Sequence, residues 1–169
     1  KPVILVNMTG SAMDLNLAEE RCAAVIQAWY PGSRGGQAVA ELLFGGVSPA
    51  GRLPVTFYRT VEELPDFTNY SMKGRTYRYM KNEALYPFGY VLSYNTFQYE
   101  ALNQPQWQEG RLIFKVRIHN EGNMDGEEVA QLYTVHKSKT VESPNCSLRG
   151  FQRMNIQKGS SVDVEFVLT

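Results

Sequence analysis

Tyrosine and arginine side chains alternate over residues 70–79, which read YSMKGRTYRY. Tyrosine rings can stack on the C–H faces of a sugar, and the Arg75 and Arg78 guanidinium groups can pair with carboxylates. The stretch therefore suits either a sugar platform or a contact in which both arginines meet acids of a neighbouring domain while the tyrosines pack. Packing or interdomain use is the favoured interpretation, because charged side chains commonly lay their apolar stems on such surfaces.

Residues that could carry out acid–base chemistry do not form a recognisable set. His119 and His136 lack a nucleophile motif around them, which a serine or cysteine mechanism would need. Glutamates occur as sequence neighbours, but adjacent side chains point apart in helices and strands, so adjacency does not make a carboxylate pair. These neighbours are Glu19–Glu20, Glu62–Glu63 and Glu127–Glu128. We therefore expect no complete active site in this chain.

Three further classes of site are disfavoured. Residues 31–36 (PGSRGG) could hold an anion at a helix N-terminus, but no G-K-[ST] follows, so a tight turn is the preferred interpretation. Cys22 and Cys146 have no metal-ligand spacing, and we expect no metal and no cofactor. The 17 basic residues balance 17 acidic ones, and no apolar run approaches the roughly 18 residues of a membrane span. We thus expect neither nucleic acid nor a membrane as partner.

The pattern of apolar residues in the first half of the chain is typical of an α/β layer. Residues 3–6 (VILV) predict a strand buried on both faces, and the ambiguous run 23–30 favours another because Pro31-Gly32 follows it. Apolar spacing predicts helices within 14–24 and 37–44. Residues 53–57 (LPVTF) predict a third strand. This order suggests a mainly parallel sheet, followed over residues 60–92 by an irregular wrap.

From about residue 94 the pattern is all-β. Apolar and polar residues alternate in 97–99, 111–118 and 128–133, with turn residues between them. We count four or five strands, where a β-sandwich usually has about seven, so the sandwich looks incomplete. The chain also begins and ends inside strand-like runs, which suggests a segment of a longer protein. Its compartment is unknown; the low cysteine content favours the cytoplasm.

Several motifs, in the same order, resemble those of glycoside hydrolase family 3, and the similarity runs from about residue 3 to 166. The matching segments are 28–32 (AWYPG), 35–36 (GG), 40–45 (AELLFG), 49–57 (PAGRLPVTF), 74–79 (GRTYRY), 85–90 (LYPFGY), 92–94 (LSY), 128–133 (EVAQLY) and 148–153 (LRGFQR). The resemblance implies the C-terminal part of an α/β-sandwich domain at residues 1–92. An incomplete fibronectin type III-like β-sandwich would follow at 93–169.

The resemblance also implies an activity. Members are β-glucosidases, β-xylosidases and relatives that release terminal sugars with retention, through two carboxyl groups about 5 to 5.5 Å apart. The nucleophile Asp lies on a preceding barrel domain and the acid/base Glu upstream of the strand that begins here, so no catalytic residue is assigned to this chain. The implied partners are an oligosaccharide or aryl β-glycoside and the missing N-terminal barrel. Arg75, Tyr77 and Arg78 are the candidates for the cleft rim or a domain interface.

Two positions depart from the family pattern. Val91 stands where a glycine is usual, and we expect an extended turn there, since a positive φ would strain valine. Residues 145–147 (NCS) stand where the family usually carries a lysine before Leu-Arg-Gly-Phe.

The alternatives to an enzyme segment are a non-catalytic carbohydrate-binding module and a subunit-docking module.

Overall fold

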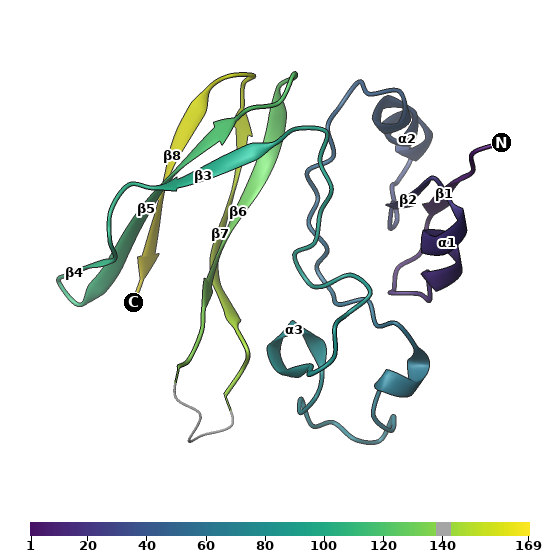
Figure 1. Ribbon diagram of the computed structural model, residues 1–169, viewed down its shortest axis with the longest axis horizontal. Coiled ribbons are helices and arrows are strands. Elements are labelled where there is room, and N and C mark those ends of the chain that lie inside the picture. Colours follow the sequence, from purple (N-terminus) through teal and green to yellow (C-terminus); the bar gives the residue numbers. More distant parts are fainter. Residues whose placement is uncertain (138–142) are drawn as a thin grey trace. The chain divides into compact units, whose positions relative to one another are not determined.

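The computed structural model describes residues 1–137 and 143–169 (Figure 1). Its contacts divide the chain into two compact units. The first, the α/β unit, contains residues 1–46, 53–90 and 143–145; the second, the sandwich unit, contains residues 47–52, 91–137 and 146–169. Each unit therefore includes a short segment whose sequence neighbours belong to the other unit.

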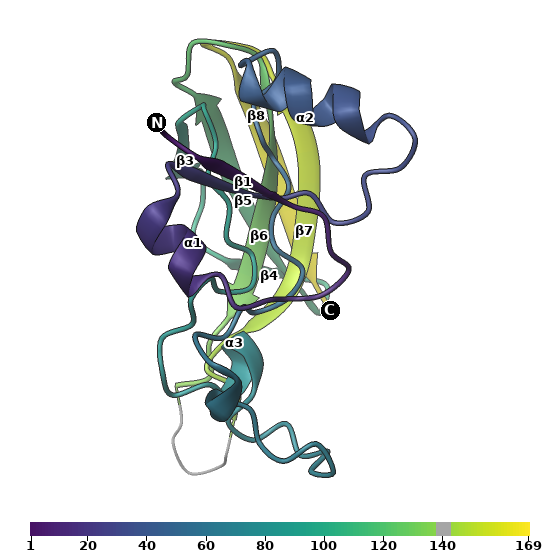
Figure 2. The ribbon, with the colours of Figure 1, turned by 90° about the vertical axis from the view of Figure 1, so that its right-hand side faces the viewer.

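The α/β unit is built on two parallel strands. Strand β1 (Ile4–Asn7) pairs with β2 (Ala24–Gln27) with Ile4 opposite Ala24. Helix α1 (Asn16–Arg21) and helix α2 (Gly35–Leu43) flank this pair in both views (Figures 1 and 2). The predicted strand over 23–30 is thus confirmed but ends early, because Trp29 takes a φ of 54° and turns the chain.

The third strand predicted over residues 53–57 is wrong. Only Phe57 forms a β-bridge, with Tyr86. Leu53 exchanges backbone hydrogen bonds with Gly89 and Tyr90. The chain then bends at Pro54 and Val55, between Leu53 and Phe57. Pro54 has no N–H to give to a ladder, which explains why an apolar run of this length does not extend the sheet.

A small apolar core holds the α/β unit together. Leu15, Phe57 and Leu85 are its buried members, and Phe57 is completely enclosed. The rings of Trp29 and Tyr86 meet Phe57 edge-on, at centroid distances of 6.3 and 6.0 Å. The irregular wrap predicted for residues 60–92 is confirmed: it contains only the 3₁₀ turn η1 (Val61–Glu63) and the one-turn helix α3 (Thr76–Tyr79) among its regular elements.

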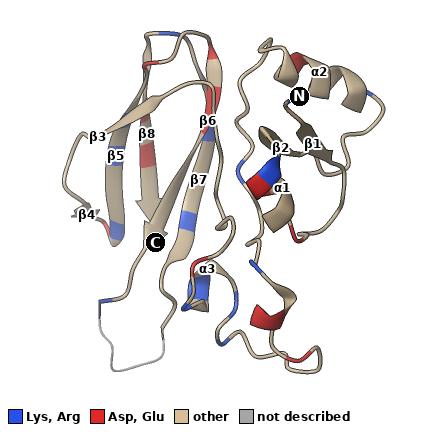
Figure 3. Ribbon diagram, turned by 45° about the vertical axis from the view of Figure 1, so that its right-hand side comes forward, with Lys and Arg blue, Asp and Glu red and all other residues tan. Residues whose placement is uncertain are grey.

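The sandwich unit has two antiparallel sheets. One contains β3 (Phe97–Ala101), β4 (Gln106–Gln108), β5 (Arg111–Asn120) and β8 (Ser161–Leu168), and the other pairs β6 (Gly126–Thr134) with β7 (Ser147–Ile156). In the described ranges the sandwich has six strands, where four or five were expected. The three-residue β4 is too short to show the alternation that predicts a strand. The core between the sheets takes buried residues from β5, β6, β7 and β8. Acidic and basic positions are interspersed along these strands (Figure 3).

A short strap, residues 47–52, completes the sandwich unit from within the α/β half of the sequence. Its Arg52 donates Nε–H to the Val129 carbonyl at 2.6 Å and forms an ion pair with Glu128. Glu128 is buried, with 6% of its surface exposed. At the other end of the strap, the Ser48 and Ser93 hydroxyls are hydrogen-bonded at 2.9 Å. A buried carboxylate needs such a partner, so the strap is an integral part of the sandwich.

Breaking the buried pair should therefore destabilise the sandwich unit far more than breaking an exposed one. We expect Glu128→Ala to lower the free energy of unfolding by about 3 kcal/mol, because it leaves the Arg52 charge without its partner. The neighbouring Glu127 forms an exposed pair with Arg153, and Glu127→Ala should cost at most about 1 kcal/mol. Urea unfolding followed by circular dichroism measures both; equal losses would contradict the assignment.

Tyr99 provides a second test of the same cluster. Burial, followed by the nearby Glu128 carboxylate, raises the pKa of Tyr99 to about 12. Since the unfolded phenol ionises near pH 10, its contribution to stability is intact below pH 10 and is lost as pH rises toward 12. An ultraviolet titration should therefore show late-ionising tyrosine that Tyr99→Phe reduces. If Tyr99→Phe instead reduces the absorbance change near pH 10, the placement of Tyr99 close to Glu128 is contradicted.

Candidate functional site

The three predicted site residues lie at helix α3: Arg75 directly precedes it, and Tyr77 and Arg78 belong to it. All three side chains are half-buried. Gly74 turns the chain with a φ of 72°, and Thr76, the first residue of α3, takes the unusual φ of 54°. For a β-branched residue this conformation costs on the order of 1–2 kcal/mol, so neighbouring groups must hold it in place.

Side chains from residues 56–58 hold the start of α3. The Thr76 N–H donates to the Tyr58 hydroxyl at 2.8 Å, and the Tyr77 N–H donates to the buried Thr56 hydroxyl at 3.2 Å. These bonds satisfy N–H groups that a helix cannot pair internally. The motif 49–57 is therefore linked to the motif 74–79 by one direct hydrogen bond, between Thr56 and Tyr77, which the sequence patterns alone did not indicate.

Tyr77 packs within its own unit. Its ring stacks on Phe88 with centroids 4.5 Å apart and an interplanar angle of 17°. One face of the ring is thus covered, which weakens the sugar-platform interpretation at this position and agrees with the packing alternative. Tyr70, at the start of the same stretch, is 88% exposed, whereas Tyr77 is half-buried.

Both arginines keep unused hydrogen-bonding capacity. An Nη2 of Arg75 donates to the Asn69 carbonyl, and the Arg78 guanidinium lies 5.7 Å from the centroid of the Tyr79 ring. Within the part of the chain that the structure describes, the Nε–H of each arginine is buried and has no acceptor. A carboxylate or hydroxyl of another domain could accept these bonds once the half-buried side chains turn toward it, which is chemistry suited to a cleft rim or a domain interface.

Other titratable groups are committed to local partners. His119 Nδ1 lies 2.9 Å from the Ser161 hydroxyl across β5 and β8, but Asp163 is bound by Arg117 through two bonds of 2.7 and 2.9 Å. This bidentate bond lowers the pKa of Asp163. Asp163 is therefore already paired and does not orient the imidazole, as the acid of a serine–histidine mechanism would.

Metal and membrane chemistry find no support in the described residues. Over residues 1–137 and 143–169, no three His, Cys, Asp or Glu side chains lie close enough to hold a metal ion. Cys22 and Cys146 are both free thiols. None of the helices in these ranges is long and apolar enough to cross a bilayer.

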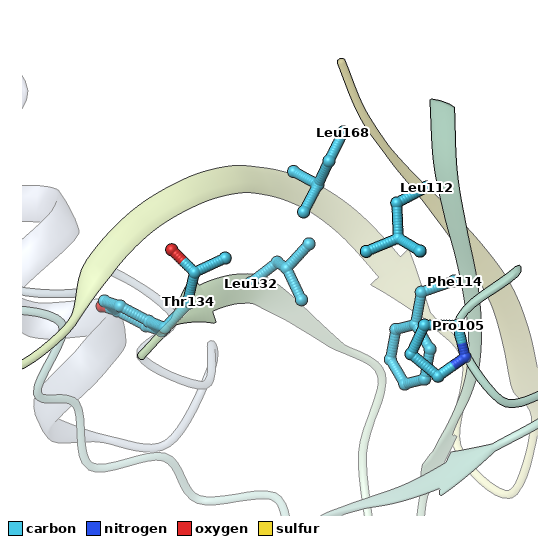
Figure 4. Close-up of a pocket in the computed structure, with 7 residues that line it drawn as sticks. Pro105, Leu112, Phe114, Leu132, Thr134 and Leu168 are labelled. Atoms are coloured by element: carbon cyan, nitrogen blue, oxygen red, sulfur yellow. The ribbon is translucent and has the colours of Figure 1, made fainter. Parts of the chain in front are cut away.

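An apolar recess of ≈ 220 Å³ opens in the sandwich unit (Figure 4). Its lining is mostly aliphatic and aromatic, and comprises Pro105, Leu112, Phe114, Leu132, Tyr133, Thr134 and Leu168. A sugar site needs several convergent polar groups, and this recess presents few. Trp107 on β4 is 74% exposed, and a single ring of this kind makes a poor platform for a polysaccharide. Neither this recess nor Trp107 alone has the features of a carbohydrate site.

Comparison with known protein families shows which class of protein has this architecture. The family model described as "Glycosyl hydrolase family 3 C-terminal domain" matches residues 1–94, and that described as "Fibronectin type III-like domain" matches 128–169. The α/β unit and the sandwich are therefore parts of a glycosidase architecture. The chain belongs to glycoside hydrolase family 3, as the motifs had predicted.

Relatives of the chain are named as xylosidases and glucosidases. It is 45% identical, over its whole length, to a xylan 1,4-beta-xylosidase of Xylanibacter ruminicola, covering 20% of that protein. It is 33% identical over 98% of its length to a periplasmic beta-glucosidase of Salmonella typhimurium, covering 24% of it. The chain therefore spans about a fifth to a quarter of the curated relatives it matches.

Solved structures agree with this fold. The Kluyveromyces marxianus beta-glucosidase matches with a TM-score of 0.88 at 28% identity, over 99% of this chain and 21% of that one. The Listeria innocua beta-glucosidase matches with a TM-score of 0.85 at 29% identity, over 100% of this chain and 25% of that one. The expected fold class, part of an α/β sandwich followed by a fibronectin-like sandwich, is confirmed.

The Tyr77–Phe88 stack should stabilise the position of α3. A double-mutant cycle of Tyr77→Ala and Phe88→Ala should give a coupling of about 1 kcal/mol in the free energy of unfolding. Tyr77→Phe keeps the ring and should lose little of that coupling. Urea unfolding of the four variants measures it, and additive losses would show that the two rings do not interact.

Proposed function

We propose that this chain is the C-terminal part of a retaining, exo-acting β-glycosidase that removes terminal β-linked xylose or glucose from oligosaccharides. The observation that carries the proposal is the match along the whole chain to proteins named as xylosidases and glucosidases. The higher identity to a xylosidase favours a xylose-terminated substrate. Oligosaccharides and aryl β-glycosides are the proposed substrates.

The proposed division of labour assigns catalysis to other residues of the enzyme. The nucleophile Asp and the acid/base Glu would lie on the preceding barrel and upstream part of the α/β domain, which this chain would complete together with a sandwich from about residue 93. Glu128, the buried acid among the described residues, supports this view because Arg52 already neutralises it.

Arg75, Tyr77 and Arg78 are proposed to lie at the cleft rim or at the interface with the barrel domain. Their support is the pair of buried Nε–H groups without an acceptor in the described residues. A group that places the catalytic loop needs no proton of its own to matter, since a 1 Å misplacement can cost on the order of 100-fold in rate. Substituting these arginines should therefore affect turnover even though they perform no chemistry.

A chimera tests the proposal. The xylosidase of Xylanibacter ruminicola would receive this chain in place of the segment it matches, and hydrolysis of an aryl β-xyloside would be measured. We expect the chimera to be active and the same enzyme without the segment to be inactive. Arg75→Ala with Arg78→Ala should lower kcat/KM about tenfold, whereas Arg111→Ala, on the exposed start of β5, should change it less than twofold. A folded but inactive chimera would contradict the proposal.

A further inference from the structure

The C-terminal end of α3 is held by a residue from far along the chain. Helix α3 has four residues, and a one-turn helix leaves its last carbonyls without internal partners. Asn145 supplies two donors to this end of the helix. Its backbone N–H bonds to the Arg78 carbonyl at 2.6 Å, and its side-chain Nδ2–H bonds to the Met80 carbonyl at 2.8 Å.

The connection that carries Asn145 is longer than a hairpin needs. Strand β6 ends at Thr134 and β7 begins at Ser147, whereas hairpin loops usually have about two to five residues. Residues 143–145 group with the α/β unit, and the chain rejoins the sandwich unit at Cys146. Pro144 limits the backbone freedom just before Asn145. This connection therefore delivers a restrained residue to the unit that contains α3.

Asn145 completes a set of hydrogen bonds that hold both ends of the helix containing Tyr77 and Arg78. Tyr58 and Thr56 bind the N–H groups at the start of α3, and Asn145 binds carbonyls at its end. An isolated turn of helix is not stable in water, because nucleation fixes several residues for one hydrogen bond. The backbone from which the Arg78 side chain extends is thus fixed at one end by residues 56–58 and at the other by Asn145.

We propose that Asn145 is a positioning residue for Tyr77 and Arg78, acting through the backbone of α3. The proposal rests on the proposed function, because the proposed function assigns Tyr77 and Arg78 to the cleft rim or the barrel interface. It assigns Asn145, which precedes β7, a role in fixing α3 within the α/β unit. It also gives a role to Asn145 in the segment 145–147, where the sequence departs from the family pattern.

Hydrogen exchange of the full chain tests the contact itself. The Tyr79 and Met80 N–H groups close α3 on the Arg75 and Thr76 carbonyls, at 3.1 and 2.9 Å. Asn145→Ala should speed exchange of these two amides about five- to tenfold, as expected for the loss of one hydrogen bond. Asn145→Asp keeps the shape but puts a carboxylate against the Met80 carbonyl, so its effect should be larger. Asn155→Ala, an exposed asparagine on β7, is the matched control.

Kinetics of the chimera separates this inference from the proposed function. Asn145→Ala should lower kcat/KM for the aryl β-xyloside about threefold and Asn145→Asp by more, while Asn145→Gln, which keeps the amide donor, should recover part of the loss. Unchanged exchange at Tyr79 and Met80, or faster exchange with full kcat/KM, would overturn the positioning role. An inactive chimera with the native chain would reject the proposed function, and the exchange result would still decide whether Asn145 holds α3.

Discussion

The buried ion pair between Arg52 and Glu128 is the constraint on which the sandwich unit depends. A carboxylate enclosed among apolar residues is costly unless a cation and hydrogen bonds compensate it. Glu128 obtains both from a strap that the sequence places more than seventy residues earlier. Because Arg52 also reaches the Val129 carbonyl, the strap is fixed to β6 at two adjacent residues. The strap thus ties the first part of one family motif, residues 49–52, to the distant motif 128–133 within the sandwich unit.

The sequence predicted the elements better than the links between them. Strand β1, helices α1 and α2, and strands β5 and β6 were predicted from the spacing of apolar residues, and the structure confirms them. Helix α3 and strand β7 were not predicted. The strand predicted at 53–57 failed because Pro54 removes a donor that no apolar pattern can replace. Val91 is not among the described residues with positive φ, so valine causes no left-handed strain at this position.

The contacts of the candidate site were harder to foresee. Periodicity reports which residues share a face of one element, but it carries no information on which distant residue supplies a hydrogen bond. Nothing in the pattern around residue 145 indicated that Asn145 would bond to the carbonyls of Arg78 and Met80. The aromatic–basic run 70–79 was recognisable, yet the stacking of Tyr77 on Phe88 and the hydrogen bond from Tyr77 to Thr56 depend on tertiary structure.

Three observations support the proposal that this chain shapes a site and performs no chemistry itself. The buried acid Glu128 is neutralised by Arg52, and Asp163, close to the His119–Ser161 pair, is bound by Arg117. The two half-buried arginines Arg75 and Arg78 have Nε–H groups with no acceptor in the described residues. The most direct test is the hydrolysis of an aryl β-xyloside by the purified 169-residue chain. The account predicts no turnover above the buffer rate. Turnover that disappears when one of this chain's own carboxylates is replaced by its amide would contradict it.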